Sequence, residues 1–139
     1  MHTNLTSRSA TRSASVPAPP ETVIALLGDP QRLSEWAPEF ARSIRPDDDG
    51  WLVETDAGPQ PLEFRIDAEH GTVDLVRPGD TSRGAFIRTI PNRNGSEVVF
   101  TLLFPDDVSE DAIAQQMVVV EGELATVRTL CSPRPARDA

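Results

Sequence analysis

The sequence contains few of the side chains that usually carry catalysis or bind metals. Its only histidines are His2 and His70, its only cysteine is Cys131, and it has no tyrosine. Structural zinc sites need several cysteine or histidine ligands, so no metal site is predicted. A glycine-rich phosphate loop and a G-x-S-x-G nucleophile motif are both missing, so we predict no cofactor and no catalytic residue.

The orientation of Arg88 decides whether a guanidinium group points into the protein, where it could meet a ligand. If Arg93-Asn94-Gly95 forms a three-residue hairpin loop, Arg88 lies opposite Phe100 on an apolar face and points into the protein. A buried guanidinium is costly without a partner, which could be a ligand carboxylate or enolate, or Glu54. If Asn94-Gly95 instead forms a two-residue turn, the pairing shifts by one residue and Arg88 faces solvent. The sequence leaves both registers open.

Other polar residues are weaker candidates. His70 stands in Glu69-His70-Gly71, a typical turn sequence, so we interpret it as an exposed residue rather than a general base. Glu54 alternates with Trp51, Val53 and Thr55, which form the more apolar face of their strand, so Glu54 is expected to face water. Gln116 and Glu121 flank an apolar helix stripe. Either could reach a cavity edge, although such flanks are more often solvated.

The elements that position these residues begin with a weak strand over 8–16 and two short helices. Pro20 suits the first turn of a helix, and Val23, Leu26 and Leu27 share one helical face. Asp29-Pro30 then caps and starts a second helix that carries Leu33 and Trp36 three residues apart on one face. Pro38 is expected to end this helix.

From residue 40 to 104 the apolar pattern changes to the period of two that is typical of strands. Turn sequences, among them 47–50 and 57–60, separate the segments. The pattern predicts an antiparallel meander of six further strands. These strands are expected at 40–45, 51–56, 62–67, 73–77, 85–90 and 97–104.

Residues 109–130 give the strongest helix prediction. Ser109 is a plausible cap. Apolar residues then recur every three or four positions and form one continuous stripe. The stripe consists of Ile113, Met117, Val120, Leu124, Val127 and Cys131. The fold class is therefore α+β: a curved antiparallel sheet of about seven strands wrapped around a long C-terminal helix, as one domain over 8–131 with disordered ends at 1–7 and 132–139.

Composition limits the partners. Thirteen basic and 22 acidic residues give a net charge of 13 − 22 = −9, and the arginines are scattered in a chain without lysine. No basic patch is available for nucleic acid, and no apolar run is long enough to span a membrane. One cysteine and no apolar leader fit a cytoplasmic location. A homodimer remains open.

The order of elements and several motifs resemble the SRPBCC, or helix-grip, superfamily, which includes START domains, the birch-pollen allergen and polyketide cyclase-like proteins. The resemblance rests on Pro19-Pro20-Glu21-Thr22-Val23, Asp29-Pro30, Leu33, Trp36 and the segment 95–102 before the last helix. It implies a cavity between sheet and helix that holds an apolar small molecule. Lining residues expected on this basis are Trp36, Trp51, Phe64, Leu75, Phe86, Arg88, Phe100, Met117 and Val120.

Fold alone does not decide function in such a family. Our first hypothesis is binding or transport of a lipid, polyketide or isoprenoid-like molecule in this cavity. The rival is a polyketide aromatase/cyclase-like enzyme in which Arg88 stabilises an enolate. A third possibility is a protein-interaction module. The scarcity of histidine and tyrosine favours binding.

Overall fold

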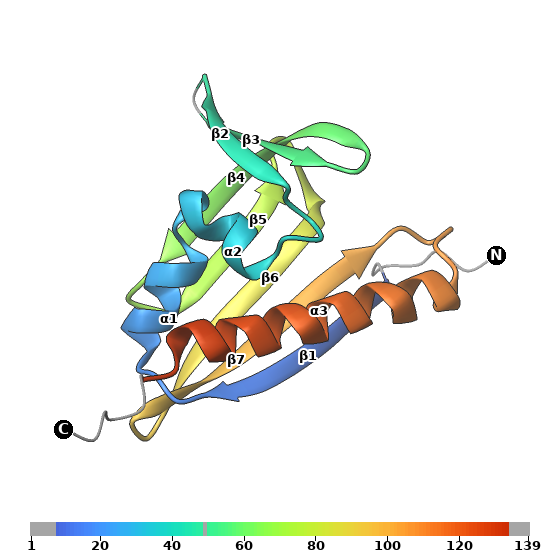
Figure 1. Cartoon of the computed structure of the whole chain (residues 1–139). Coiled ribbons are helices and arrows are strands. Elements are labelled where there is room, and N and C mark those ends of the chain that lie inside the picture. The colour runs from blue at the N-terminus through green and yellow to red at the C-terminus, as the bar shows by residue number, and fades with distance from the viewer. Residues whose placement is uncertain (1–7, 49, 134–139) are drawn as a thin grey trace.

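The computed structural model describes residues 8–48 and 50–133 of the chain (Figure 1). The disorder expected for 1–7 and 132–139 therefore falls outside the described residues, except at Ser132 and Pro133. The elements are β1 (Arg8–Val16), α1 (Pro20–Leu27), η1 (Pro30–Arg32), α2 (Leu33–Trp36), β2 (Ser43–Asp47), β3 (Gly50–Thr55), β4 (Gly58–Asp67), β5 (Thr72–Arg77), β6 (Asp80–Asn92), β7 (Gly95–Phe104) and α3 (Glu110–Cys131).

Within the described residues the strands form one antiparallel sheet in the order β1-β7-β6-β5-β4-β3-β2. β2 to β7 follow one another as a meander, and β1 closes the far edge by pairing with β7 along its whole length, from Arg8 opposite Phe104 to Val16 opposite Ser96. The predicted α+β helix-grip fold is confirmed: two short helices follow β1, and the long α3 packs on the sheet (Figure 1).

The β6–β7 hairpin has a register that neither sequence alternative anticipated. Asn92 pairs with Gly95, so the loop consists of Arg93 and Asn94, and Arg93 takes a positive φ of 55°. Arg88 consequently pairs with Val99 rather than with Phe100. Because side chains alternate along a strand, this shift sends Arg88 to the opposite face of the sheet.

The start of β4 also differs from the prediction. Residues 57–60 were expected to form a turn because they contain Gly58 and Pro59, but β4 already begins at Gly58. Its first residues pair only with β3, since pairing with β5 starts at Glu63. A proline is tolerated there because its missing N–H leaves no ladder hydrogen bond unmade on the unpaired side.

The helices are capped as the sequence indicates. The Asp29 carboxylate accepts a hydrogen bond from the Gln31 N–H at 3.0 Å, and the Ser109 hydroxyl accepts one from the Ala112 N–H at 3.1 Å. The α3 stripe is buried from Met117 to Cys131, while Ile113 is half-buried. None of the described helices is long and apolar enough to cross a membrane.

Candidate functional site

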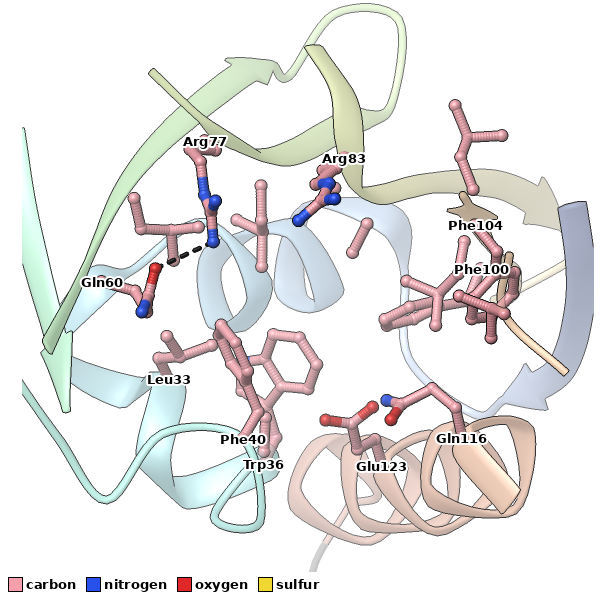
Figure 2. A pocket seen from close by; sticks show the side chains of 18 of the residues that line it. Leu33, Trp36, Phe40, Gln60, Arg77, Arg83, Phe100, Phe104, Gln116 and Glu123 are labelled. Atoms are coloured by element: carbon pink, nitrogen blue, oxygen red, sulfur yellow. Dashed lines mark hydrogen bonds between the residues drawn. The ribbon is translucent and has the colours of Figure 1, made fainter. Parts of the chain in front are cut away.

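A cavity of about 490 Å³ lies between the sheet, α2 and α3. α2 and the segment after it close one side, β4 to β7 form the curved wall, and α3 forms the floor (Figure 2). Most of the wall is apolar. Its large apolar side chains are Leu33, Trp36, Phe40, Leu62, Leu75, Phe100, Leu102, Leu103 and Phe104.

Two aromatic residues fix the shape of the interior. The rings of Trp36 and Phe100 meet edge to face, with their centroids 6.4 Å apart. Trp36 is almost fully buried, and its indole Nε1 has no hydrogen-bond partner among the described residues. Two rings in this arrangement are held more firmly than their area alone would give. They place two rings at a steep angle to each other in the apolar part of the cavity wall.

Glu123 is the polar feature that stands out in the wall. It lies on α3, only 8% of its surface is exposed, and no hydrogen bond or ion pair to another described residue is found for it. Figure 2 shows its carboxyl and the amide of Gln116 directed from α3 toward the cavity. Burial, and to a smaller degree the nearby charge of Glu39, raises the pKa of Glu123 to about 7.

The opposite side of the cavity is cationic. Arg77 at the end of β5 and Arg83 on β6 both line it, together with Gln60 from β4. Arg77 donates a hydrogen bond to Gln60 Oε1 at 2.8 Å (Figure 2). Both arginines are otherwise exposed, so they lie where the cavity meets solvent. Neither forms an ion pair with a carboxylate within the part of the chain that the structure describes.

The structure brings only some of the expected lining residues to the cavity. Trp36, Leu75 and Phe100 line it. Met117 and Val120 lie on the face of α3 that is buried in the core, but they are not part of the cavity wall. Core and wall share one face of the fold, so the sequence pattern does not separate them.

Four expected residues lie elsewhere. Phe64 is half-buried and packs against the core, and Trp51 is half-buried on β3; neither lines the cavity. Phe86 and Arg88 face away from the interior, because Ile87 between them is the buried residue. Arg88 is exposed, so the expectation that it lines the cavity is wrong.

The remaining polar candidates are placed on the surface. His70 is exposed, and its Nδ1 lies 2.8 Å from Asp67 Oδ2, a hydrogen bond that lowers the pKa of Asp67. Glu54 lies on the outer face of β3, where Arg45 donates a hydrogen bond to it at 3.1 Å. No group of three or more metal-binding side chains occurs among the residues that the structure describes.

Comparison with known proteins agrees with this geometry. The profile of the polyketide cyclase/dehydrase and lipid transport family matches residues 7–124. The chain belongs to this family. No curated protein sequence matches it significantly.

Solved structures show the same fold at low sequence identity. An uncharacterised protein from Bacillus thuringiensis is 16% identical, with 88% of this chain and 98% of that one covered and a TM-score of 0.71. The Zhui aromatase/cyclase from a Streptomyces species is 14% identical, with 89% and 93% covered and a TM-score of 0.67. The Aha1 dimer from Colwellia psychrerythraea is 13% identical, with 93% and 99% covered and a TM-score of 0.68.

Proposed function

We propose that this family member binds an apolar small molecule, a lipid, polyketide or isoprenoid-like compound, in the cavity between the sheet and α3. The observation that carries the proposal is the cavity itself. Its volume of about 490 Å³ falls within the range typical of small-molecule sites, and its wall is mainly apolar. Transfer of an apolar surface from water into such a cavity is favourable in proportion to the area buried.

The charged groups indicate how the ligand is oriented. Arg77 and Arg83 line the cavity where it meets solvent, and they have no carboxylate partner among the described residues. Guanidinium groups bind carboxylates and other oxyanions through charge-assisted hydrogen bonds. An acidic or enolic head group therefore fits at these arginines, with the apolar body reaching inward to Trp36 and Phe100.

Filling the cavity tests the proposal. Ala85 is half-buried on β6 and lines the cavity between Leu75 and Leu102, so Ala85→Phe places a ring in the space that the ligand needs. A naphthalene dye that fluoresces in apolar surroundings should bind the wild type and should bind this variant much more weakly. Ala114→Phe adds the same ring at an exposed position of α3 and should leave binding unchanged. Equal binding by all three folded proteins would contradict the proposal.

A second candidate function is catalysis of an aromatase/cyclase-like reaction in the same cavity. One observation favours it: the carboxyl of Glu123, with a pKa of about 7, faces the cavity. A group with a pKa near the working pH can both take up and release a proton. Incubation with a linear polyketone separates the two candidates, because a carrier returns the compound unchanged, whereas an enzyme yields a cyclised product and loses this activity in Glu123→Gln.

A further inference from the structure

Glu123 gives the cavity a specificity that goes beyond apolar binding. We propose that its carboxyl is the binding partner of a hydrogen-bond donor on the ligand, so that the cavity prefers apolar molecules carrying a neutral hydroxyl, phenol or enol over equally apolar ones without a donor. This inference rests on the proposed binding function and names the class of ligand for the same site.

The carboxyl of Glu123 has no hydrogen-bond partner among the described residues. Buried polar groups in proteins nearly always form hydrogen bonds, because an unmade bond costs the full desolvation of the group. Ser96, another buried polar residue, follows this rule and donates to the Ala18 carbonyl oxygen at 2.7 Å. Glu123 is 8% exposed, against 1% for Ser96, and its carboxyl opens on the cavity without a bond to any described residue. A ligand is the partner that the cavity can still supply.

The Glu123 side chain points toward the cavity. Figure 2 shows the Glu123 carboxyl directed into the space that Trp36, Phe100 and the two arginines enclose, beside the Gln116 amide. It therefore lies on the wall that an apolar ligand body would cover. A ligand without a donor at this point would shield the carboxyl from any remaining water without forming a hydrogen bond to it.

The surrounding charges favour a neutral donor over a cation. Arg77 and Arg83 line the same cavity from the sheet, so an organic ammonium bound at Glu123 would face two guanidinium groups across the cavity. Glu39 acts on Glu123 from the segment after α2, where both residues, with Trp36, line a smaller hollow of about 260 Å³. A hydroxyl or enol satisfies the carboxyl without adding a positive charge to this environment.

The proposal predicts opposite pH effects for two kinds of ligand. A ligand donor stabilises the ionised carboxylate, so binding of a hydroxylated ligand should strengthen as the pH rises through the Glu123 pKa of about 7. An apolar ligand without a donor makes the charged form less favourable, so its binding should weaken over the same range. In Glu123→Gln both dependences should disappear, because an amide does not titrate.

Equilibrium dialysis with β-naphthol and its methyl ether tests this, since the two probes have nearly the same apolar body and only the naphthol donates. Measurements at about pH 5.5 and about pH 8 lie on either side of the Glu123 pKa and below a phenolic pKa of about 10. In the wild type, the preference for naphthol over ether should grow about tenfold between these pH values. Glu121→Gln, which removes an exposed carboxylate from the same helix, should behave like the wild type.

The outcomes distinguish failure of the proposed role of Glu123 from failure of the proposed binding function. A naphthol-to-ether ratio that is the same at both pH values in the wild type would overturn the role of Glu123, as would a pH dependence that survives in folded Glu123→Gln. If neither naphthalene binds the wild type at all, the proposed function itself fails, and the inference fails with it.

Discussion

The arginines of this chain differ in whether a carboxylate lies beside them. Many of them lie next to carboxylates on the surface. The described ion pairs are Arg12 with Glu121, Arg32 with Glu35, Arg42 with Asp56, Arg45 with Glu54 and Arg65 with Glu63. Arg77 bonds to the neutral amide of Gln60, and Arg83 has no bonded partner among the described residues. In a chain with a net charge of −9, these two cavity arginines provide a local positive potential.

This predicts that Arg83 selects for acidic ligands. Arg83→Gln should weaken binding of an anionic naphthalene sulfonate dye about two- to fivefold, as expected for a partly exposed ion pair, and should leave binding of a neutral naphthylamine dye unchanged. Arg88→Gln is the matched control, because Arg88 is on the same strand but faces away from the cavity. Fluorescence titration measures both affinities. The prediction fails if the two arginine variants bind the anionic dye with the same affinity, or if Arg83→Gln weakens binding of both dyes equally.

The same residues show what the sequence can and cannot predict about the site. Trp36, Leu75 and Phe100 were expected from the family resemblance and their places on apolar faces, because a residue on the buried face of this fold is either core or cavity wall. The sequence left the face of Arg88 open because one residue of hairpin register decides it; Arg88 faces solvent, as one alternative had it, so its place among the expected lining residues was wrong. Glu123 was missed because it lies directly beside Leu124 of the stripe. A carboxylate at the edge of an apolar stripe usually lies on the outer surface, and only the packing of α2 beside α3 shows that this one lines a cavity.

Among the elements, α3 both stabilises the fold and forms the floor of the site. Its apolar stripe packs against the core, and its flank presents Gln116 and Glu123 to the cavity. The stripe, both N-terminal caps and the order of elements were predictable, since they depend on residues close in sequence. The start of β4 was not, because whether a proline fits a strand depends on which neighbour the strand pairs with.

Truncation of the stripe should therefore destabilise the whole fold. Leu124 is 3% exposed and belongs to the main core, so Leu124→Ala should lower the free energy of unfolding by about 2–5 kcal/mol. Leu130→Ala makes the same change on the same helix at a position that is 40% exposed, and it should cost much less. Urea denaturation followed by circular dichroism gives both values. Similar losses for the two variants would mean that α3 does not depend on this stripe for packing.

At the scale of the whole molecule, folding places an ionisable group where its charged form is disfavoured. The net charge of −9 also opposes compaction at neutral pH, and Glu39 adds to the negative potential around Glu123. The free energy of unfolding is consequently smaller with Glu123 ionised than with its carboxyl protonated. Ligand binding and pH should act on the stability of the protein through this one group.

The pH dependence of stability has a definite sign. The folded pKa of Glu123, about 7, lies above its ordinary value of 4.5, so the folded state holds this proton more tightly than the unfolded chain. Stability should therefore fall as the pH rises from about 4.5 toward 7 and should then level off, with a change of about 2–3 kcal/mol between about pH 5 and about pH 8. The shift comes first from burial, so salt should reduce it only slightly.

Folding shifts the pKa values of other groups as well, so the prediction is best measured as a difference between variants. Burial also raises the pKa values of Asp74 and Cys131, while the hydrogen bond from His70 lowers that of Asp67. Glu123→Gln should gain stability relative to the wild type as the pH rises, by most of that 2–3 kcal/mol, roughly the cost of keeping the charge buried. Glu121→Gln removes an equal charge from an exposed position and should follow the wild-type curve. Parallel curves for the wild type and Glu123→Gln would show that the carboxyl ionises in the folded protein without penalty.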